Sequence, residues 1–395
     1  MNYSVPGFFA SGIAAGIKKT SARDLGLLTS EKPATAAGVF TTNKIKAAPV
    51  LLTQDKLHRG IAQALIVNSG NANACTGAAG LRDARQLCKS VAAALTLPED
   101  LVMVSSTGII GVPLPMDTIT PHIPRLVATL SPAGLEDFAE AIMTTDTFPK
   151  LVMQKERVDG KEITLCGVAK GAGMIMPSMA TLLSFLITDV AIERDLLRDL
   201  LTEALNTSYN RITIDGETST NDMVIIMANG CADNRILGEH SPDLATFRGM
   251  LHTLLGDLSH LILKDAEGST KIIHIRVENA RSPEEGKKIA YKVANSLLVK
   301  TAFYGEDANW GRILAAAGQA GADIDPDRID IFFDDVLMVR NGMGCGDAAE
   351  AEASRVLKKP EFVITIDLNM GNGSASMFTC DFSIDYVKIN ADYRS

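Results

Sequence analysis

The residues of this sequence that could do chemistry are hydroxyl side chains, and the one in the most informative setting is Thr181. It lies in an uncharged run from Gly171 to Thr188, where a segment with glycine and proline changes into the strand-like sequence LLSFLI. A threonine hydroxyl is a weak nucleophile unless a base lies beside it, and no histidine is adjacent in the sequence. If the chain were cut between Ala180 and Thr181, the new α-amino group, with a reference pKa of about 7.7–8.0, could serve as that base.

Thr181 has the chemistry to make this cut itself. Its hydroxyl would attack the carbonyl carbon of Ala180, the acyl group would move from nitrogen to oxygen, and water would hydrolyse the ester. The small Ala180 leaves room for the tetrahedral intermediate, and Gly171 and Gly173 allow a kinked loop before the strand. A Met-Ala-Thr stretch also fits a plain strand entry, so the residue pattern alone leaves both interpretations open.

Other segments rich in hydroxyls and small residues stand beside apolar strands. They are VNSGNANACTG (67–77), VSSTGIIG (104–111) and TTDT (144–147). Main-chain amides in tight glycine turns can point at a developing oxyanion, so these segments suit acyl chemistry. The sequence has no H-E-x-x-H, C-x-x-C, P-loop or G-x-S-x-G motif, and its six cysteines and six histidines are dispersed. We therefore expect neither a zinc site nor a disulfide framework.

Amphipathic helices and short strands must position these segments. Apolar residues recur at three and four positions in 81–95, 192–205, 244–263 and 284–303, which predicts helices. Apolar β-rich runs predict strands at 64–68, 102–106, 162–168, 182–188, 223–228, 271–277, 329–333 and 361–368. The last segment, SMFTCDFSIDYVKI, alternates as a meander of strands would. The class is therefore mixed α and β, with helices layered on largely antiparallel sheets rather than a doubly wound parallel sheet.

Length and charge restrict the class of protein. The 395 residues predict about two or three domains, with a boundary favoured at 281–286, and 46% apolar and 22% charged residues are typical of a globular chain. A net charge of −9 argues against nucleic-acid binding and favours small metabolites as partners. The N-terminus lacks the positive segment of a signal peptide, and glycines, a proline and serines make the 171–188 run a poor membrane span. We expect a cytoplasmic protein with no membrane partner.

Motifs spread in order over essentially the whole chain resemble the ornithine acetyltransferases, also called glutamate N-acetyltransferases, the bifunctional acetyltransferase family of arginine biosynthesis. The motifs are TAAGVFTTNKIKAAPV, VNSGNANACTG, SSTGIIG, AIMTTDTFPK, KGAGMIMPSMATLLSFLITD, TIDGETSTND, GEDANWGRI and YVKINADYRS. The resemblance implies a precursor that cuts itself between Ala180 and Thr181 into an α chain, 1–180, and a β chain, 181–395, with a C-terminal α+β subdomain over about 282–395. It also implies a helix–sheet–sheet–helix sandwich similar to the N-terminal nucleophile hydrolases with different connectivity, and an assembly of two α and two β chains.

The resemblance further implies the reaction and its residues. Acetyl would pass from N2-acetyl-L-ornithine to L-glutamate by a ping-pong route through an acetyl ester of Thr181, without a metal or organic cofactor, and acetyl-CoA stays open as a second donor. Matching the motifs residue by residue places two residues in the oxyanion hole and six on the substrate. The oxyanion pair is Thr107 and Gly108, and the substrate set is Thr144, Lys170, Thr181, Glu267, Asn390 and Ser395.

Alternatives to this interpretation differ in what happens to the acyl group. An aminopeptidase or amidase with the same kind of nucleophile would transfer the acyl group to water, and a non-catalytic metabolite-binding or scaffold protein would stay uncut.

The two charged residues of the substrate set suit opposite groups of an amino acid: Lys170 suits a substrate carboxylate, and Glu267 suits a substrate ammonium group. Each also fits a plain structural role, Lys170 as a loop lysine and Glu267 as a helix-end residue, while Asn390 and Ser395 fit a frayed tail.

Overall fold

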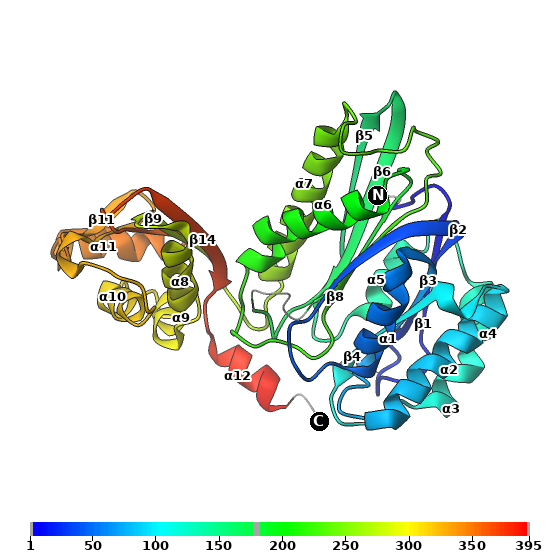
Figure 1. The fold of residues 1–395 in the computed structure, drawn as a ribbon. Helices are drawn as coiled ribbons and strands as arrows, with labels where there is room; N and C mark the ends of the chain where they lie inside the picture. Colours follow the sequence, from blue (N-terminus) through cyan, green and yellow to red (C-terminus); the bar gives the residue numbers. More distant parts are fainter. Residues whose placement is uncertain (1–2, 177–181, 393–395) are drawn as a thin grey trace. The chain divides into compact units, whose positions relative to one another are not determined.

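The structure of the chain is a computed structural model, and it describes residues 3–176 and 182–392. Ala180, Thr181 and Ser395, three residues singled out in the sequence, lie outside the described part. Figure 1 shows a mixture of helices and sheets, so the predicted mixed α/β class is confirmed. Among the helices of the described residues, none combines the length and the apolar character that a membrane crossing requires.

The chain divides into two compact units. The first consists of Met1–Asn210 and Glu217–Ile262, and the second of Arg211–Gly216 and Leu263–Ser395. The second unit starts earlier than the subdomain predicted at about 282, because strand β9 (Ile272–Ala280) pairs only with strands that come later in the chain. The predicted division into two chains, 1–180 and 181–395, stays a prediction.

The first unit is built on one eight-stranded sheet. Its strands are β1 (Phe8–Ile13), β2 (Leu25–Phe40), β3 (Ile61–Asn71), β4 (Val102–Ile109), β5 (Lys150–Val158), β6 (Lys161–Lys170), β7 (Leu183–Thr188) and β8 (Met223–Ala228). They follow the order β4-β3-β2-β8-β7-β6-β5, with β1 paired to β2, and only the β3–β4 and β7–β8 pairs are parallel. The long strand β2 joins the two halves of the sheet, because its first part pairs with β1 and β3 and its last part pairs with β8.

Helices pack on both halves of this sheet. They are α1 (Ala48–Lys56), α2 (Gly77–Leu95), α3 (Met116–Ile119), α4 (Ile123–Ala128), α5 (Leu135–Ile142), α6 (Arg194–Thr207) and α7 (Leu244–Lys264). One apolar core lies between the halves and includes Leu65 of β3 and Phe185 of β7. α2 and α4 pack on β1–β4, and α7 lies against β6 (Figure 1). Gly167 of β6 leaves space there for the side chain of Leu254. The layers run helix, sheet, sheet, helix as predicted, although one hydrogen-bonded sheet supplies both middle layers.

The second unit has its own six-stranded sheet, in the order β12-β11-β10-β13-β9-β14. The remaining strands are β10 (Asp330–Phe333), β11 (Val336–Arg340), β12 (Met343–Gly344), β13 (Glu361–Asp367) and β14 (Gly373–Cys380). The helices are α8 (Pro283–Ala294), α9 (Leu297–Tyr304), α10 (Trp310–Gly318), α11 (Asp347–Val356) and α12 (Ile384–Ala391). Its core joins inward side chains of β9, such as Ile275, to α8 residues such as Ile289. Alternating burial along β13 gives this sheet one apolar and one polar face.

Two element predictions were wrong, both because a serine begins a helix. The segment 284–303 forms two helices, since the side chain of Ser296 accepts a hydrogen bond from the amide of Val299 and starts α9. The C-terminal alternation continues as a strand only to the end of β14. After it, the hydroxyl of Ser383 accepts hydrogen bonds from the amides of Asp385 and Tyr386 and begins α12.

Candidate functional site

The segment that contains Ala180 and Thr181 connects two neighbouring strands of the first unit. β6 ends at Lys170, β7 begins at Leu183, and these two residues are partners in the antiparallel pairing of the strands. The connection therefore begins and ends at the same end of this strand pair. Whatever holds its two ends controls the position of the predicted cleavage site.

A buried carboxylate, Asp146, holds the first end. Its Oδ1 accepts hydrogen bonds from the amide of Gly171 at 2.8 Å and from Nζ of Lys150 at 2.6 Å, and its Oδ2 accepts one from the amide of Thr144 at 2.9 Å. Nζ of Lys170 lies 3.9 Å from Oδ2 and donates to Oγ1 of Thr144 at 2.7 Å. The structure thus brings together Thr144 and Lys170, two of the predicted substrate-binding residues.

Positive charge surrounds this carboxylate. Burial alone would raise the pKa of Asp146, but the charges of Lys170 and Lys150 and its hydrogen bonds hold that pKa below its usual range. A third cation, Lys18, lies near enough to interact with Asp146 and Lys170; burial lowers the pKa of Lys18, against an opposing effect of Asp24. Three lysines thus share two buried carboxylates, Asp146 and Asp24, and this excess of positive charge favours an anionic ligand.

The predicted oxyanion residues lie at the end of β4, where its pairing with β3 becomes irregular. Gly108 has a φ of +132°, and a Cβ atom there would lie 2.3 Å from the carbonyl carbon of Gly70, so a side chain does not fit. Thr107 is half-buried, and its hydroxyl forms no hydrogen bond with the residues that the structure describes. A hydroxyl that no described residue binds, beside a glycine turn, is suited to stabilising an oxyanion.

Two consecutive residues that precede β8, Asn221 and Asp222, link this glycine turn to the start of β7. Nδ2 of Asn221 donates to the carbonyl oxygen of Ser106, the residue before Thr107, at 2.8 Å. The carboxyl group of Asp222 accepts a hydrogen bond from the amide of Leu182, the first residue after Thr181. One dipeptide therefore contacts the neighbour of the predicted oxyanion residues and the neighbour of the predicted nucleophile.

Asp222 itself is an unusual ionisable group, because it is only 1% exposed. Burial raises the pKa of its carboxyl group well above the usual range. Hydrogen bonds from Ser219 and from the amide of Leu182, and the charge of Lys170, act in the opposite direction without cancelling the effect of burial. The carboxyl group is therefore held in its neutral form over a wider pH range than an exposed aspartate.

Two further predicted residues meet within the second unit. Nδ2 of Asn390, on α12, donates a 2.8 Å hydrogen bond to Oε2 of Glu267, which is 9% exposed. The start of α12 is fastened to the same turn, because the hydroxyl of Ser383 donates to the carbonyl oxygen of Gly268. The structure thus brings Glu267 and Asn390 together, while their roles on the substrate stay predictions.

Sequence reasoning missed the charged and amide residues that organise the site. Asp146 and the pair Asn221 and Asp222 lie inside TTDT and TIDGETSTND, two motifs that the sequence did single out. Their partners are distant in the chain, 25 residues for the Asp146–Gly171 bond and 115 residues for the Asn221–Ser106 bond. A motif identifies a segment, but it does not show which of its residues form hydrogen bonds with the other segments of the site.

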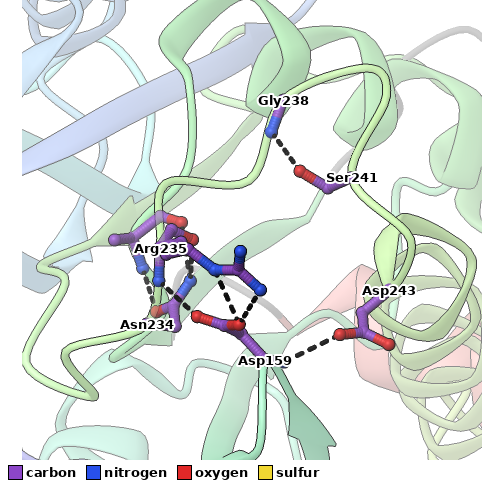
Figure 2. Close-up of polar contacts among 7 residues, drawn as sticks. Asp159, Asn234, Arg235, Gly238, Ser241 and Asp243 are labelled. Atoms are coloured by element: carbon purple, nitrogen blue, oxygen red, sulfur yellow. Dashed lines mark hydrogen bonds and ion pairs between the residues drawn. The ribbon is translucent and has the colours of Figure 1, made fainter.

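A cavity of about 540 Å³ also opens in the first unit, along the loop Arg235–Asp243. Figure 2 shows the guanidinium of Arg235 against Asp159, with Nε 2.8 Å from Oδ1, and the amide of Asp159 donates to Asp243 at 2.8 Å. These groups pair with one another and fasten the loop, and the lining includes none of the predicted site residues. In the described ranges, no cluster of three or more potential metal ligands occurs.

Comparison with known proteins gives consistent matches along the chain. The ArgJ family profile matches residues 9–395. The chain is 53% identical to the arginine biosynthesis bifunctional protein ArgJ of Geobacter sulfurreducens, covering 99% of this chain and 100% of the relative. It is 49% identical to the protein of the same name from Syntrophotalea carbinolica, covering 99% of each. A solved structure of ornithine acetyltransferase complexed with ornithine, from Mycobacterium tuberculosis, is 44% identical over 44% of this chain and 93% of that chain, with a TM-score of 0.40.

Proposed function

The chain belongs to the ArgJ family, and from this premise we propose that it transfers an acetyl group from N2-acetyl-L-ornithine to L-glutamate in arginine biosynthesis. The chain first cuts itself between Ala180 and Thr181 into residues 1–180 and 181–395. Thr181 then carries the acetyl group as an ester between the two substrates. Two copies of each piece form the assembly, and acetyl-CoA is a second donor to be tested by competition.

One observation supports this proposal above the others: Asn221 and Asp222 bond to Ser106 and Leu182, the neighbours of Thr107 and Thr181. Acyl transfer needs an oxyanion donor and a nucleophile at the same carbonyl group. The link fixes these two segments relative to each other, as that chemistry needs, and it therefore favours a reacting residue 181 over a plain strand entry.

The proposed reaction uses the same groups twice. In the first step the hydroxyl of Thr181 attacks the acetyl carbon of acetylornithine, and ornithine leaves as the amine. In the second step the amine of glutamate attacks the ester and releases the hydroxyl. Thr107 and Gly108 stabilise the oxyanion in both steps, and the α-amino group of Thr181 accepts and returns the proton.

Lys170 and Glu267 are the proposed anchors of the amino-acid substrates. Lys170 is 5% exposed and held by Thr144, so it presents a fixed positive charge to a carboxylate. Glu267, held by Asn390, presents a negative charge to an ammonium group. Reversing either charge should raise the substrate KM in steady-state assays with each substrate varied in turn. A KM equal to that of the wild type would remove the residue from this role.

The test of the proposed function is the intact mass of the purified protein under denaturing conditions, beside a Thr181→Ala variant. Two chains in the wild type, the second beginning at Thr181, with the variant left whole, would support the nucleophile. A whole wild-type chain, or a variant that is still cut, would contradict it. Acetate released from acetylornithine in the absence of glutamate would favour the hydrolase alternative over the transferase.

A further inference from the structure

A second cavity lies on the sheet of the second unit. Its volume is about 250 Å³, and the residues that line it all belong to that unit. Its polar lining consists of Arg211, His274, Arg276, Glu278, Ser374 and Ser376. The proposed acetyl transfer uses none of these side chains, so their convergence needs an explanation of its own.

Strand register places four side chains on one face of this sheet. In the antiparallel pairing of β9 with β14, Arg276 lies opposite Ser376, and His274 lies opposite Phe378. Residues two apart on a strand point to the same face, so all four share it. The rings of His274 and Phe378 stack there with their centroids 4.1 Å apart. This is the face turned away from the apolar core, because Ile275, which alternates with these residues, is buried against α8.

The segment Arg211–Gly216 brings a second arginine to the same place. Ile212 forms a parallel bridge with Phe378, and the amide of Thr213 donates to the carbonyl oxygen of Phe378 at 2.9 Å. β14 is the edge strand of the six-stranded sheet, so its outer side is free to accept this segment. Arg211 therefore reaches the cavity from beyond the edge, whereas Arg276 reaches it from within the sheet.

Positive charge exceeds negative charge at this cavity. Burial, followed by the charges of Arg276 and Arg211, lowers the pKa of His274 to about 4, so the ring is neutral at pH 7 with both guanidinium groups near it. Neither guanidinium forms an ion pair within the part of the chain that the structure describes. Glu278 is the carboxylate of the lining, and two arginines against one glutamate leave an excess of positive charge. This balance favours an anion.

Several hydrogen-bond donors of the lining lack an acceptor. Nε of Arg276 donates to Nδ1 of His274 at 3.3 Å, which places the proton of the neutral ring on Nε2. That nitrogen is buried and has no partner among residues 3–176 and 182–392. The hydroxyl groups of Ser374 and Ser376 also form no hydrogen bond with a described residue. Guanidinium and hydroxyl groups are donors that phosphate oxygens accept from.

We propose that this cavity binds a phosphate group between the guanidinium groups of Arg211 and Arg276, with the hydroxyl groups of Ser374 and Ser376 as further donors. A phosphate dianion carries one negative charge for each arginine, and each guanidinium can donate two parallel N–H bonds to its oxygens. Free phosphate and the phosphate of a nucleotide share this chemistry. The site lies in the second unit and does not depend on the proposed acetyl transfer.

The experiment is isothermal titration calorimetry of the purified protein with inorganic phosphate, and separately with adenosine monophosphate, at constant ionic strength. We expect saturation at one site per chain. Arg276→Gln or Arg211→Gln should raise the Kd at least about tenfold, the effect of losing one charged hydrogen bond. Glu278→Gln should lower the Kd, because it removes a repelling charge. Arg281→Gln is the matched control, since Arg281 is an exposed arginine of the same unit that already pairs with Asp323, and it should leave the Kd unchanged.

Three results would overturn the phosphate site: no saturable binding of either ligand up to about 10 mM, a Kd that neither cavity arginine changes, or an equal loss in Arg281→Gln. The four substituted side chains are exposed, so each variant should keep the thermal unfolding midpoint of the wild type. If Arg276→Gln unfolds at a lower temperature, Arg276→Lys decides, because it keeps the charge and loses the parallel hydrogen bonds; a wild-type Kd there would also refute the site. Within a confirmed site, equal Kd values for the two ligands indicate free phosphate, and a lower Kd for adenosine monophosphate indicates a nucleotide.

Discussion

Replacing Asp146 by asparagine in the Thr181→Ala background should lower the free energy of unfolding of the first unit by about 4 kcal/mol. The background removes cleavage as a variable, so that both proteins are single chains of the same length. The substitution changes the charge of the group that holds Gly171, Lys150 and Thr144 with almost no change in volume.

The magnitude follows from the burial of the ion pair. The side chains of Asp146 and Lys150 are both 0% exposed, with Nζ 2.6 Å from Oδ1. Removing one partner of a buried ion pair costs about 3–5 kcal/mol, because the remaining charge loses that compensation. The carboxylate also accepts two main-chain amides on separate oxygens, and asparagine keeps only one oxygen, so one of these hydrogen bonds is lost as part of the same cost. A loss of about 4 kcal/mol is a change of roughly a thousandfold in the folded-to-unfolded ratio.

The assay is urea denaturation at pH 7 followed with two probes. Circular dichroism reports both units, whereas fluorescence reports the second unit, because the chain has one tryptophan, Trp310 on α10. A shifted dichroism transition with an unchanged fluorescence transition would locate the loss in the first unit. Asp100→Asn is the control, because the Asp100–Arg59 pair is 59% and 68% exposed and should contribute no more than about 1 kcal/mol.

A second substitution tests the cause of the loss. Adding Lys150→Met to Asp146→Asn removes the charge that the first change leaves behind, so part of the lost stability should return. If Asp146→Asn costs no more than Asp100→Asn, or if Lys150→Met restores nothing, the buried ion pair is not what stabilises this end of the connection.

Two further predictions concern the glycine turn and the neutral carboxyl group. Gly108→Ala should slow acetyl transfer by about 100-fold, as loss of an oxyanion donor does. Gly111→Ala is the control, because Gly111 is also at positive φ but has open space around its Cβ, and it should change the rate little. Equal acetyl-transfer rates of the two variants would contradict the role of the turn. In the Thr181→Ala background, the stability of Asp222→Asn relative to its parent should rise with pH above about pH 4. The reason is that an aspartate whose folded pKa is raised loses stability as pH rises from its unfolded pKa toward its folded pKa. The difference should grow by at most about 1.4 kcal/mol per pH unit in thermal or urea unfolding, and a difference independent of pH would refute the raised pKa.

Most of the regular elements could be predicted because their pattern is local. The helix predicted at 81–95 is the main part of α2, and the strand predicted at 223–228 has the bounds of β8. Apolar spacing reports which side of an element will be buried, whatever it packs against. The failures came where a single serine hydroxyl starts a helix inside an apolar pattern, at Ser296 and Ser383.

The sequence by itself determined the kind of chemistry: a threonine between a small-residue loop and an apolar strand, with hydroxyl and glycine motifs elsewhere that match a family. Only the tertiary structure decided which groups hold those motifs in place. Asp146 and the dipeptide Asn221–Asp222 act through hydrogen bonds to residues far away in the chain, and their charge states depend on burial and on Lys170. Strand register and burial set these contacts, and both are properties of the whole fold, so a local pattern of residue types does not contain them.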